Sequence, residues 1–415
     1  MARKRVLFLA EGATMQHFVR PLALAQSLDP ERYETHFYAP SRYFKYLDGA
    51  AFATGVLDTM AGDEFLANLA RGAPLFPEPV LRRYVAEERR LLARLKPDLA
   101  IGDLRVSLPL SARLEGVPSA VLMNAYWSPH AKRRSVIPEL PITRLIPPRW
   151  LGGIFRLTEP LALAMHVRGI NAVRRQFGFA PLPPDPRHMY TDGDYVLYPD
   201  VPEFVPTTNL PSHHRYIGPC NWELPGALPD WWGRMLADSR SKVFVSLGSS
   251  GPVRILPSLL EVLSKLPVAV ILATSGRPVP VPGPPGLYAA PLLPFAQTAA
   301  VSALVVSHGG SSGFYPAIAA GAPVLGIPSN ADQQIAAAVL EESGVGLNLR
   351  VEEATASRLL AAIGALLSDR RFAAAALHWQ GIFSRSSTAA LFAEFLDHAF
   401  LGSKPSNVCT TPPRF

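Results

Sequence analysis

The fold is decided by one stretch of the sequence, residues 304–333, which reads LVVSHGGSSGFYPAIAAGAPVLGIPSNADQ. A short apolar run at 304–307 enters a glycine-rich turn, a helical pattern follows at 314–320, and a second apolar run occupies 324–327. Short apolar strands that alternate with helices are typical of a parallel sheet with helical crossovers. The stretch therefore predicts one strand–helix–strand unit of a doubly wound α/β domain.

The same alternation runs through both halves of the chain. Apolar runs predict strands at 6–10, 33–38, 99–102 and 119–123, and again at 242–247, 268–273, 287–290, 304–307 and 324–327, with a first helix at 18–28. Continuous apolarity indicates strands that are buried on both faces. The 415 residues also exceed the roughly 250 to 300 at which a single core stops growing. We therefore expect an α/β protein of two doubly wound, Rossmann-like domains with an interdomain cleft.

The composition of one segment predicts where the two domains are connected. Residues 205–238 are rich in Pro, Trp and polar side chains and show no clear period, which predicts the connection between the domains near 218–226. The expected parts are an N-terminal domain at 1–218, a C-terminal domain at 219–378, a helix at 379–401 that packs back on the N-terminal domain, and a disordered tail at 402–415.

The charge of the chain is unevenly spread. Residues 131–180 hold nine Lys or Arg against Glu139 and Glu159, a local balance of +7 that equals the net charge of the whole chain. Because the arginines alternate with apolar and aromatic residues, the stretch fits either an interfacial membrane segment or ordinary solvated helices. The pattern does not form a stacking platform for bases, so we expect no nucleic-acid partner.

Cysteine content and hydropathy indicate the cellular compartment of the protein. Cys220 and Cys409 cannot build a disulfide framework, and neither belongs to a metal-ligand cluster. The apolar run at the start of the chain is too short for a secretory signal core, and no later run reaches the ~18 apolar residues of a spanning helix. We expect a cytoplasmic protein, soluble or attached to a membrane surface.

The turn after the strand at 304–307 has the chemistry of a diphosphate site. Its sequence, His308-Gly309-Gly310-Ser311-Ser312-Gly313, opens a helix, so free N–H groups and the positive end of the helix dipole face a ligand. Ligands of open α/β sheets bind at the carboxyl ends of the strands, where His308 adds a donor. After the next strand, Asp332 and Gln333 suit hydrogen bonds to sugar hydroxyls.

The order of these elements resembles the donor motif of the family 1 inverting glycosyltransferases, the UDP-glycosyltransferase-like enzymes of bacterial natural-product type, which have the GT-B fold. The resemblance implies that the turn from His308 to Gly313 holds the donor phosphates and that Asp332 and Gln333 contact the transferred sugar. A second loop, Gly248-Ser249-Ser250, resembles the family's phosphate-facing turn but also reads as an ordinary glycine-serine loop. Pro294 lies in a segment, 292–295, that resembles the one packing against the base.

Two positions depart from the family pattern. Gly313 stands where the family has Ser or Thr, and Pro316 stands where plant members have a Glu that contacts the ribose. The resemblance therefore leaves the choice between UDP and dTDP donors open.

Inverting transfer needs a base, and histidine suits this role near neutral pH. The segment 12–25 resembles the family's Gly-His-x-x-Pro-x-Leu-Ala-Leu segment, with the proline one place later, and its leucines align His17 with the catalytic histidine. Asp103, at the end of the strand at 99–102, is expected to orient His17. A helix-capping role for His17 is the alternative. No Asp-x-Asp motif stands in the donor region, so no metal ion or other cofactor is expected.

Asn124, Tyr126 and Trp127 follow a strand end and are candidates for an acceptor pocket, with core packing as the alternative. The expected activity is the metal-independent, inverting transfer of a hexosyl group from a nucleotide sugar to a hydroxyl of a small-molecule or lipid acceptor. Two other functions stay open: a nucleotide-sugar 2-epimerase on the same fold, and a non-catalytic relative. A non-catalytic relative would normally lose His17, Asp103 or Asp332, which are all present.

Overall fold

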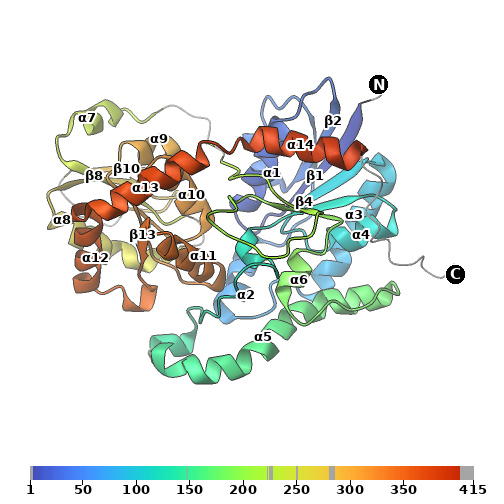
Figure 1. The fold of residues 1–415 in the computed structure, drawn as a ribbon, viewed down its shortest axis with the longest axis horizontal. Coiled ribbons are helices and arrows are strands. Elements are labelled where there is room, and N and C mark those ends of the chain that lie inside the picture. Colours follow the sequence, from blue (N-terminus) through green and yellow to red (C-terminus); the bar gives the residue numbers. More distant parts are fainter. Residues whose placement is uncertain are drawn as a thin grey trace. The chain divides into compact units, whose positions relative to one another are not determined.

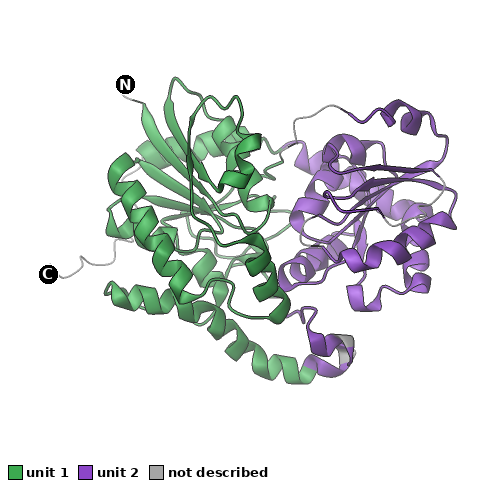
Figure 2. Ribbon diagram, turned by 180° about the vertical axis from the view of Figure 1, so that it is seen from behind, with its two compact units in different colours: residues 1–133, 153–222, 386–415 green, residues 134–152, 223–385 purple. Residues whose placement is uncertain are grey.

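The computed structural model describes residues 3–146, 148–221, 223, 228–248, 251–279 and 286–401. The chain forms two compact units (Figure 2). Unit 1 comprises residues 1–133, 153–222 and 386–415, and unit 2 comprises residues 134–152 and 223–385. Each unit is built around its own parallel sheet.

The sheet of unit 1 has seven parallel strands in the order β3-β2-β1-β4-β5-β6-β7. The strands are β1 (Lys4–Ala10), β2 (Tyr33–Ala39), β3 (Ala53–Val56), β4 (Leu99–Asp103), β5 (Ser119–Leu122), β6 (Tyr195–Tyr198) and β7 (His214–Tyr216). The helices are α1 (Gln16–Gln26), α2 (Gly62–Arg71), α3 (Glu78–Leu95), α4 (Leu108–Leu114), α6 (Pro186–Tyr190) and α14 (Thr388–Leu401), with 3₁₀ turns η1 (Ser41–Tyr46) and η2 (Ala125–Trp127). The long helix α5 (Pro148–Gln176) starts in unit 2 and continues in unit 1.

The sheet of unit 2 has six parallel strands in the order β10-β9-β8-β11-β12-β13. The strands are β8 (Ser241–Ser246), β9 (Val268–Ala273), β10 (Leu287–Ala290), β11 (Leu304–Ser307), β12 (Val324–Gly326) and β13 (Gly346–Asn348). The helices are α7 (Trp232–Ala237), α8 (Leu256–Ser264), α9 (Phe295–Ala300), α10 (Ser311–Ala319), α11 (Ala331–Glu342), α12 (Ala356–Ser368) and α13 (Arg370–Phe383), with 3₁₀ turns η3 (Pro141–Arg144), η4 (Val253–Ile255) and η5 (Val351–Glu353).

The prediction of two doubly wound parallel sheets is confirmed, and each predicted strand is present to within one or two residues. The sequence did not reveal β3, β6, β7 and β13. Two of these strands have only three residues, and β3 has no buried residue, so their apolar signal is weak. β6 is buried throughout, but it has only four residues, and two of them are tyrosines, so it forms no long apolar run.

The C-terminal helix α14 completes the core of unit 1, although it is separated from the rest of that unit by most of unit 2 in the sequence. Phe392 and Phe395 belong to the same buried cluster as Phe8 and Phe37 of the sheet (Figure 1 labels the helix and strands). Burying an aromatic side chain stabilises a protein by roughly 1.5–3 kcal/mol, so this helix adds substantially to the stability of unit 1.

Candidate functional site

The carboxyl ends of β1 and β4 bring a histidine and an aspartate together in unit 1. Ala10 and Asp103, the last residues of the two strands, are partners in the parallel register. The chain then turns, and His17 lies in the first turn of α1. Its Nδ1 is 2.7 Å from Oδ1 of Asp103. The expected pairing of Asp103 with His17 is therefore present as a hydrogen-bonded contact.

Arg20 is a third member of this group, and sequence reasoning missed it. Its Nε donates to Oδ2 of Asp103 at 2.7 Å, and its Nη2 donates to Oδ1 at 2.6 Å. Its Nη1 donates to Oδ1 of Asn124 at 2.7 Å, and the Asn124 amide in turn donates to Asp200 at 3.0 Å. The usable signal in the sequence is the spacing: Arg20 lies three residues after His17, on the same face of α1.

The charges around Asp103 decide its protonation state. Its carboxyl group is fully buried, and burial alone would raise its pKa. The guanidinium of Arg20 and the imidazole of His17 outweigh burial, and they hold the pKa of Asp103 below its ordinary value. Asp103 is therefore an anion that can fix the His17 ring and stabilise its protonated form. Because Nδ1 is engaged by Asp103, Nε2 is the ring nitrogen that can accept a proton.

A second buried network supports the loop between β1 and α1. Arg105 donates to Glu11 at 3.0 Å and to Glu88 at 2.5 Å, and its guanidinium lies 3.5 Å from the centre of the Tyr84 ring. Glu11 accepts from the backbone N–H of Gly12 at 2.9 Å. Buried charges that are paired and hydrogen-bonded hold the surrounding backbone in one arrangement, so this network fixes the start of the loop that carries His17.

The three candidate acceptor residues are largely internal. Asn124 and Tyr126 are only 3% exposed, and the Asn124 amide is hydrogen-bonded to Arg20 and Asp200. Trp127 packs edge-on against Tyr190, with ring centres 5.3 Å apart. The core-packing alternative describes their contacts in this structure, and a role in acceptor binding remains a prediction.

The glycine-rich turn of unit 2 surrounds a buried histidine. His308 follows β11 directly, Gly309 adopts a φ of +76°, and Gly310 is the N-cap residue of α10. Burial lowers the pKa of His308 to about 4, although Asp332 acts in the opposite direction, so the ring is neutral at pH 7. Nδ1 of His308 is buried and has no hydrogen-bond partner among the residues that the structure describes. An unpaired buried polar atom is costly, so this nitrogen is a candidate partner for a ligand atom.

Glycine backbone lies close to this imidazole at three positions. A Cβ at Gly310 would lie 2.8 Å from Nε2 of His308, and one at Gly313 would lie 3.2 Å from its Cε1. A Cβ at Gly248, in the loop after β8, would lie 3.4 Å from Nδ1 and from Cε1. The backbone at three points of the two predicted donor loops thus closes on one ring, which brings the loop after β8 and the turn after β11 into a single site.

Several other residues of the predicted donor site can be placed. Ser311 is buried in the first turn of α10 and Ser312 is exposed there. Pro294 is the N-cap residue of α9. Ser249 and Ser250 lie outside the described residues. Sequence reasoning missed Arg277, whose Nη1 donates to the carbonyl of Gly248 at 3.2 Å and which adds a cation beside the turn.

The loop that carries Asp332 and Gln333 is held by its own side chains. Asn330 caps α11 by accepting from the N–H of Gln333 at 3.0 Å. Oε1 of Gln333 accepts from both the N–H and the hydroxyl of Ser329, each at 3.0 Å. Gln333 is buried, whereas Asp332 is partly exposed at the start of the helix. Gln333 therefore shapes the loop, and Asp332 is the more accessible of the pair.

Residues 134–152, which we name the strap, reach this loop from the first half of the sequence. The N–H of Glu139 donates to the carbonyl of Ser329 at 2.6 Å, and the Glu139 carboxylate forms an ion pair with Arg254. Arg350 donates to the carbonyl of Ile137 at 2.8 Å. The strap is thus part of the support of the predicted sugar-contacting loop, a connection that no local sequence pattern indicated.

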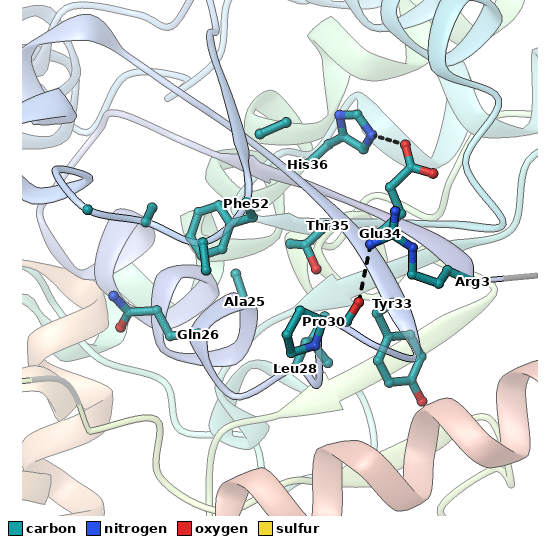
Figure 3. A pocket seen from close by; sticks show the side chains of 14 residues that line it. Arg3, Ala25, Gln26, Leu28, Pro30, Tyr33, Glu34, Thr35, His36 and Phe52 are labelled. Atoms are coloured by element: carbon teal, nitrogen blue, oxygen red, sulfur yellow. Dashed lines mark hydrogen bonds and ion pairs between the residues drawn. The ribbon is translucent and has the colours of Figure 1, made fainter.

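A pocket of about 350 Å³ in unit 1 lies away from these groups (Figure 3). It is lined by the end of α1 at Ala25 and Gln26 and by the beginning of β2 at Tyr33 to His36. Glu34 in its wall is paired with His36 at 2.9 Å and with Arg5 at 3.0 Å. Asp103 ends β4 and His17 lies at the start of α1, whereas the pocket lies at the end of α1 and the beginning of β2, so this pocket is not the site that they form.

Within the described part of the chain, no three His, Cys, Asp or Glu side chains gather as a candidate metal site. None of the helices in the same residues has the length and apolarity needed to cross a membrane.

Comparisons with known proteins give consistent relatives. A family described as erythromycin biosynthesis protein CIII-like, C-terminal domain, matches residues 256–382. A PGL/p-HBAD biosynthesis glycosyltransferase of Mycobacterium tuberculosis (strain ATCC 25177 / H37Ra) is 42% identical over 374 residues, which cover 90% of this chain and 87% of the relative. A PGL/p-HBAD biosynthesis rhamnosyltransferase of Mycobacterium bovis (strain BCG / Pasteur 1173P2) is 41% identical over 383 residues, or 92% of this chain and 85% of the relative.

Solved structures give the same architecture. The calicheamicin glycosyltransferase CalG4 superimposes with a TM-score of 0.70 at 16% identity, over 98% of this chain and 100% of that one. At this level of identity the likeness concerns the fold.

Proposed function

Because the chain belongs to the family 1 glycosyltransferases of the GT-B fold, the EryCIII-like group, we propose that it transfers a sugar from a UDP- or dTDP-sugar to a hydroxyl group, with inversion and without a metal ion. The chain is a glycosyltransferase, and the proposal concerns the stereochemistry, the donor, the acceptor and the residues that act.

The observation that carries the chemistry is the 2.7 Å contact between His17 and the buried, anionic Asp103. In the proposed reaction Nε2 of His17 takes the proton of the acceptor hydroxyl. The acceptor oxygen forms its bond to the anomeric carbon as the bond to the departing nucleoside diphosphate breaks. Asp103 holds the ring through Nδ1 and stabilises the imidazolium that results. Arg20 positions Asp103 and keeps it ionised.

Unit 2 supplies the donor site in this proposal. The N–H groups at the start of α10 and the ring of His308 hold the diphosphate, whose charge grows as the sugar leaves. The neutral His308, with its unpaired Nδ1, can donate or accept a hydrogen bond without bringing a charge into the buried site. Asp332 contacts the sugar hydroxyls, and Gln333 keeps the loop in place.

The acceptor is proposed from the relatives. Two proteins that are 41–42% identical over nine-tenths of this chain are named for PGL/p-HBAD biosynthesis, and one of them is named a rhamnosyltransferase. We therefore propose a phenolic or glycolipid hydroxyl as the acceptor and a deoxyhexose such as rhamnose among the donor sugars to be tried first. The proposal assigns three residues to the acceptor pocket: Asn124, Tyr126 and Trp127.

A donor panel tests the proposal. UDP- and dTDP-sugars are screened by thermal shift, since a ligand at 100 times its dissociation constant stabilises a protein by about 2.7 kcal/mol. The stabilising donor is then incubated with a phenolic acceptor in chelator, and the anomeric configuration of the product is determined by NMR. We expect an inverted glycoside. Retention of configuration, loss of activity in chelator, or an epimerised nucleotide sugar without glycoside would contradict the proposal.

A further inference from the structure

The first half of α5 exposes a continuous apolar stripe. Trp150, Ile154, Leu157 and Leu161 are 71%, 65%, 84% and 69% exposed. Their spacing of four, three and four residues places them on one face of the helix. Single exposed apolar residues are common on protein surfaces, but a continuous row of four large ones marks an interaction surface. Just before the helix, Leu145 is exposed as well.

The opposite face of α5 holds the helix on unit 1. Val167, Ile170 and Val173 are buried in a cluster with Leu81 and Tyr84 of α3. In Figure 2 the green part of α5 runs along the outside of unit 1. Core packing thus holds the second half of the helix on unit 1 and leaves the stripe of the first half exposed.

The stripe continues into exposed arginines. Arg168 and Arg175 are exposed and follow Leu161 at intervals of seven residues, which keeps them on the same face. The helix has five arginines and a single acidic residue, Glu159, which lies half a turn away from the stripe and is paired with Arg133 at 3.3 Å. The exposed face therefore combines large apolar side chains with positive charge and carries no acidic side chain.

We propose that this face of α5 docks the protein on an anionic lipid bilayer surface. An interfacial helix buries its apolar face to a depth of about 5–10 Å at the boundary between headgroups and acyl chains, while arginines reach the lipid phosphates. Trp150 has the amphipathic ring that favours this boundary. A second copy of the chain is a poorer occupant, because every copy carries a net charge of +7 and the same exposed arginines.

The surface is independent of the transfer chemistry, so its test uses no sugar. Purified full-length protein is sedimented with vesicles of phosphatidylcholine alone or mixed with phosphatidylglycerol, at low and high salt. We expect sedimentation with the anionic vesicles at low salt and weaker binding at high salt, because exposed charges are screened. No binding to anionic vesicles at low salt, or equal binding to neutral ones, would overturn the proposal.

Two pairs of variants locate the surface. Leu157→Glu combined with Leu161→Glu should abolish sedimentation, whereas Leu377→Glu, at an exposed leucine of α13 in unit 2, should leave it unchanged. Arg168→Gln and Arg175→Gln should each weaken binding about fivefold, the equivalent of roughly 1 kcal/mol per basic residue, and the exposed Arg370→Gln should not.

Thermal unfolding checks that the variants are folded, and these side chains are exposed enough to be replaced without disturbing the core. Unchanged binding of the double leucine variant would overturn the proposal. So would a dimer of the wild-type protein that the same variant dissociates, since the occupant would then be a second copy.

Discussion

One histidine in each unit follows the carboxyl end of a parallel strand, His17 at the start of α1 and His308 directly after β11, and their surroundings differ. His17 is engaged by Asp103, which Arg20 holds in turn, so the ring has a defined orientation without any ligand. His308 is more deeply buried, has a pKa lowered to about 4, and leaves Nδ1 without a partner in the described part of the chain.

In the proposed function, this difference separates a group that moves a proton, His17, from a group that receives a ligand, His308. A base must keep a fixed geometry and a stabilised charged form, which a buried carboxylate provides. A ligand-binding histidine is surrounded by glycine backbone, and its missing hydrogen bond is left for the ligand. The pattern of partners around each ring therefore indicates its role more directly than its place in a motif.

The largest expected effect is that of Asp103→Asn. The amide keeps the size of the carboxylate but cannot stabilise the imidazolium, and we expect kcat to fall by about 10⁴-fold. The affinity for UDP or dTDP, measured by calorimetry, should stay within twofold, roughly the error of such comparisons. Because Arg20 would lose its buried partner, circular dichroism must show that the variant is folded. A folded variant with ordinary turnover would contradict the role proposed for Asp103 beside His17.

The next effect is that of Gly310→Ala. The new Cβ would meet Nε2 of His308 at 2.8 Å, so the ring must shift. A displacement of about 1 Å can cost roughly a hundredfold, which we expect in nucleotide affinity and in KM. The φ of Gly310 is −80°, so the backbone itself tolerates alanine.

The matched control is Gly364→Ala in α12, where a Cβ would meet nothing within 4 Å. This variant should bind the nucleotide normally and gain roughly 0.5–1 kcal/mol of stability, because alanine favours a helix. Equal nucleotide affinity in both variants would show that the glycines around His308 are not needed for binding.

Arg20→Lys tests whether Arg20 positions Asp103 beside His17. Lysine keeps the positive charge but cannot donate to both oxygens of Asp103 and to Asn124 at once. Loss of one charge-assisted hydrogen bond, worth roughly 1.5–3 kcal/mol, predicts a fall in kcat of about tenfold or more with KM unchanged. The pH profile of kcat should shift, a change that a merely structural role would not produce. An unchanged profile would remove Arg20 as a positioning residue.

A further effect is on stability rather than on turnover, and it depends on pH. His308 has a folded-state pKa of about 4, whereas a histidine in the unfolded chain has an ordinary pKa of 6.5, so the unfolded chain binds more protons between these pH values. Stability should therefore fall as the pH falls from 6.5 to 4, by about 3 kcal/mol from this residue alone. Denaturant titrations of the wild type and of His308→Asn should show this difference. A gap that does not change with pH would contradict the neutral, buried state of His308.

Local sequence patterns predicted the strands and the residues at their ends, because these features depend on neighbours in the sequence. The strand, turn and helix order of 304–333 placed His308 at a strand end, and the ends of the first and fourth strands placed His17 and Asp103. Arg20 and Asp200 escaped prediction because their contacts join residues that are 76 to 104 positions apart, and the spacing of Arg20 from His17 indicates only a shared helix face.

The strap shows the same limit. Sequence-based boundaries place 134–152 with its neighbours in the first half, whereas its contacts with Ser329, Arg254 and Arg350 place it in unit 2. The short strands β7 and β13, with three residues each, are set by the pairing of the sheet rather than by their own apolarity.

The central claim is that the base and the donor-binding histidine are separate groups, and one crossed experiment tests it most directly. Nucleotide affinity by calorimetry and single-turnover transfer rates are measured for His17→Ala and His308→Ala. The account predicts that His17→Ala nearly abolishes transfer and leaves nucleotide binding almost unchanged, whereas His308→Ala weakens nucleotide binding and still supports transfer at saturating donor. Unaltered turnover in His17→Ala, or loss of nucleotide binding in that variant with normal binding in His308→Ala, would contradict it.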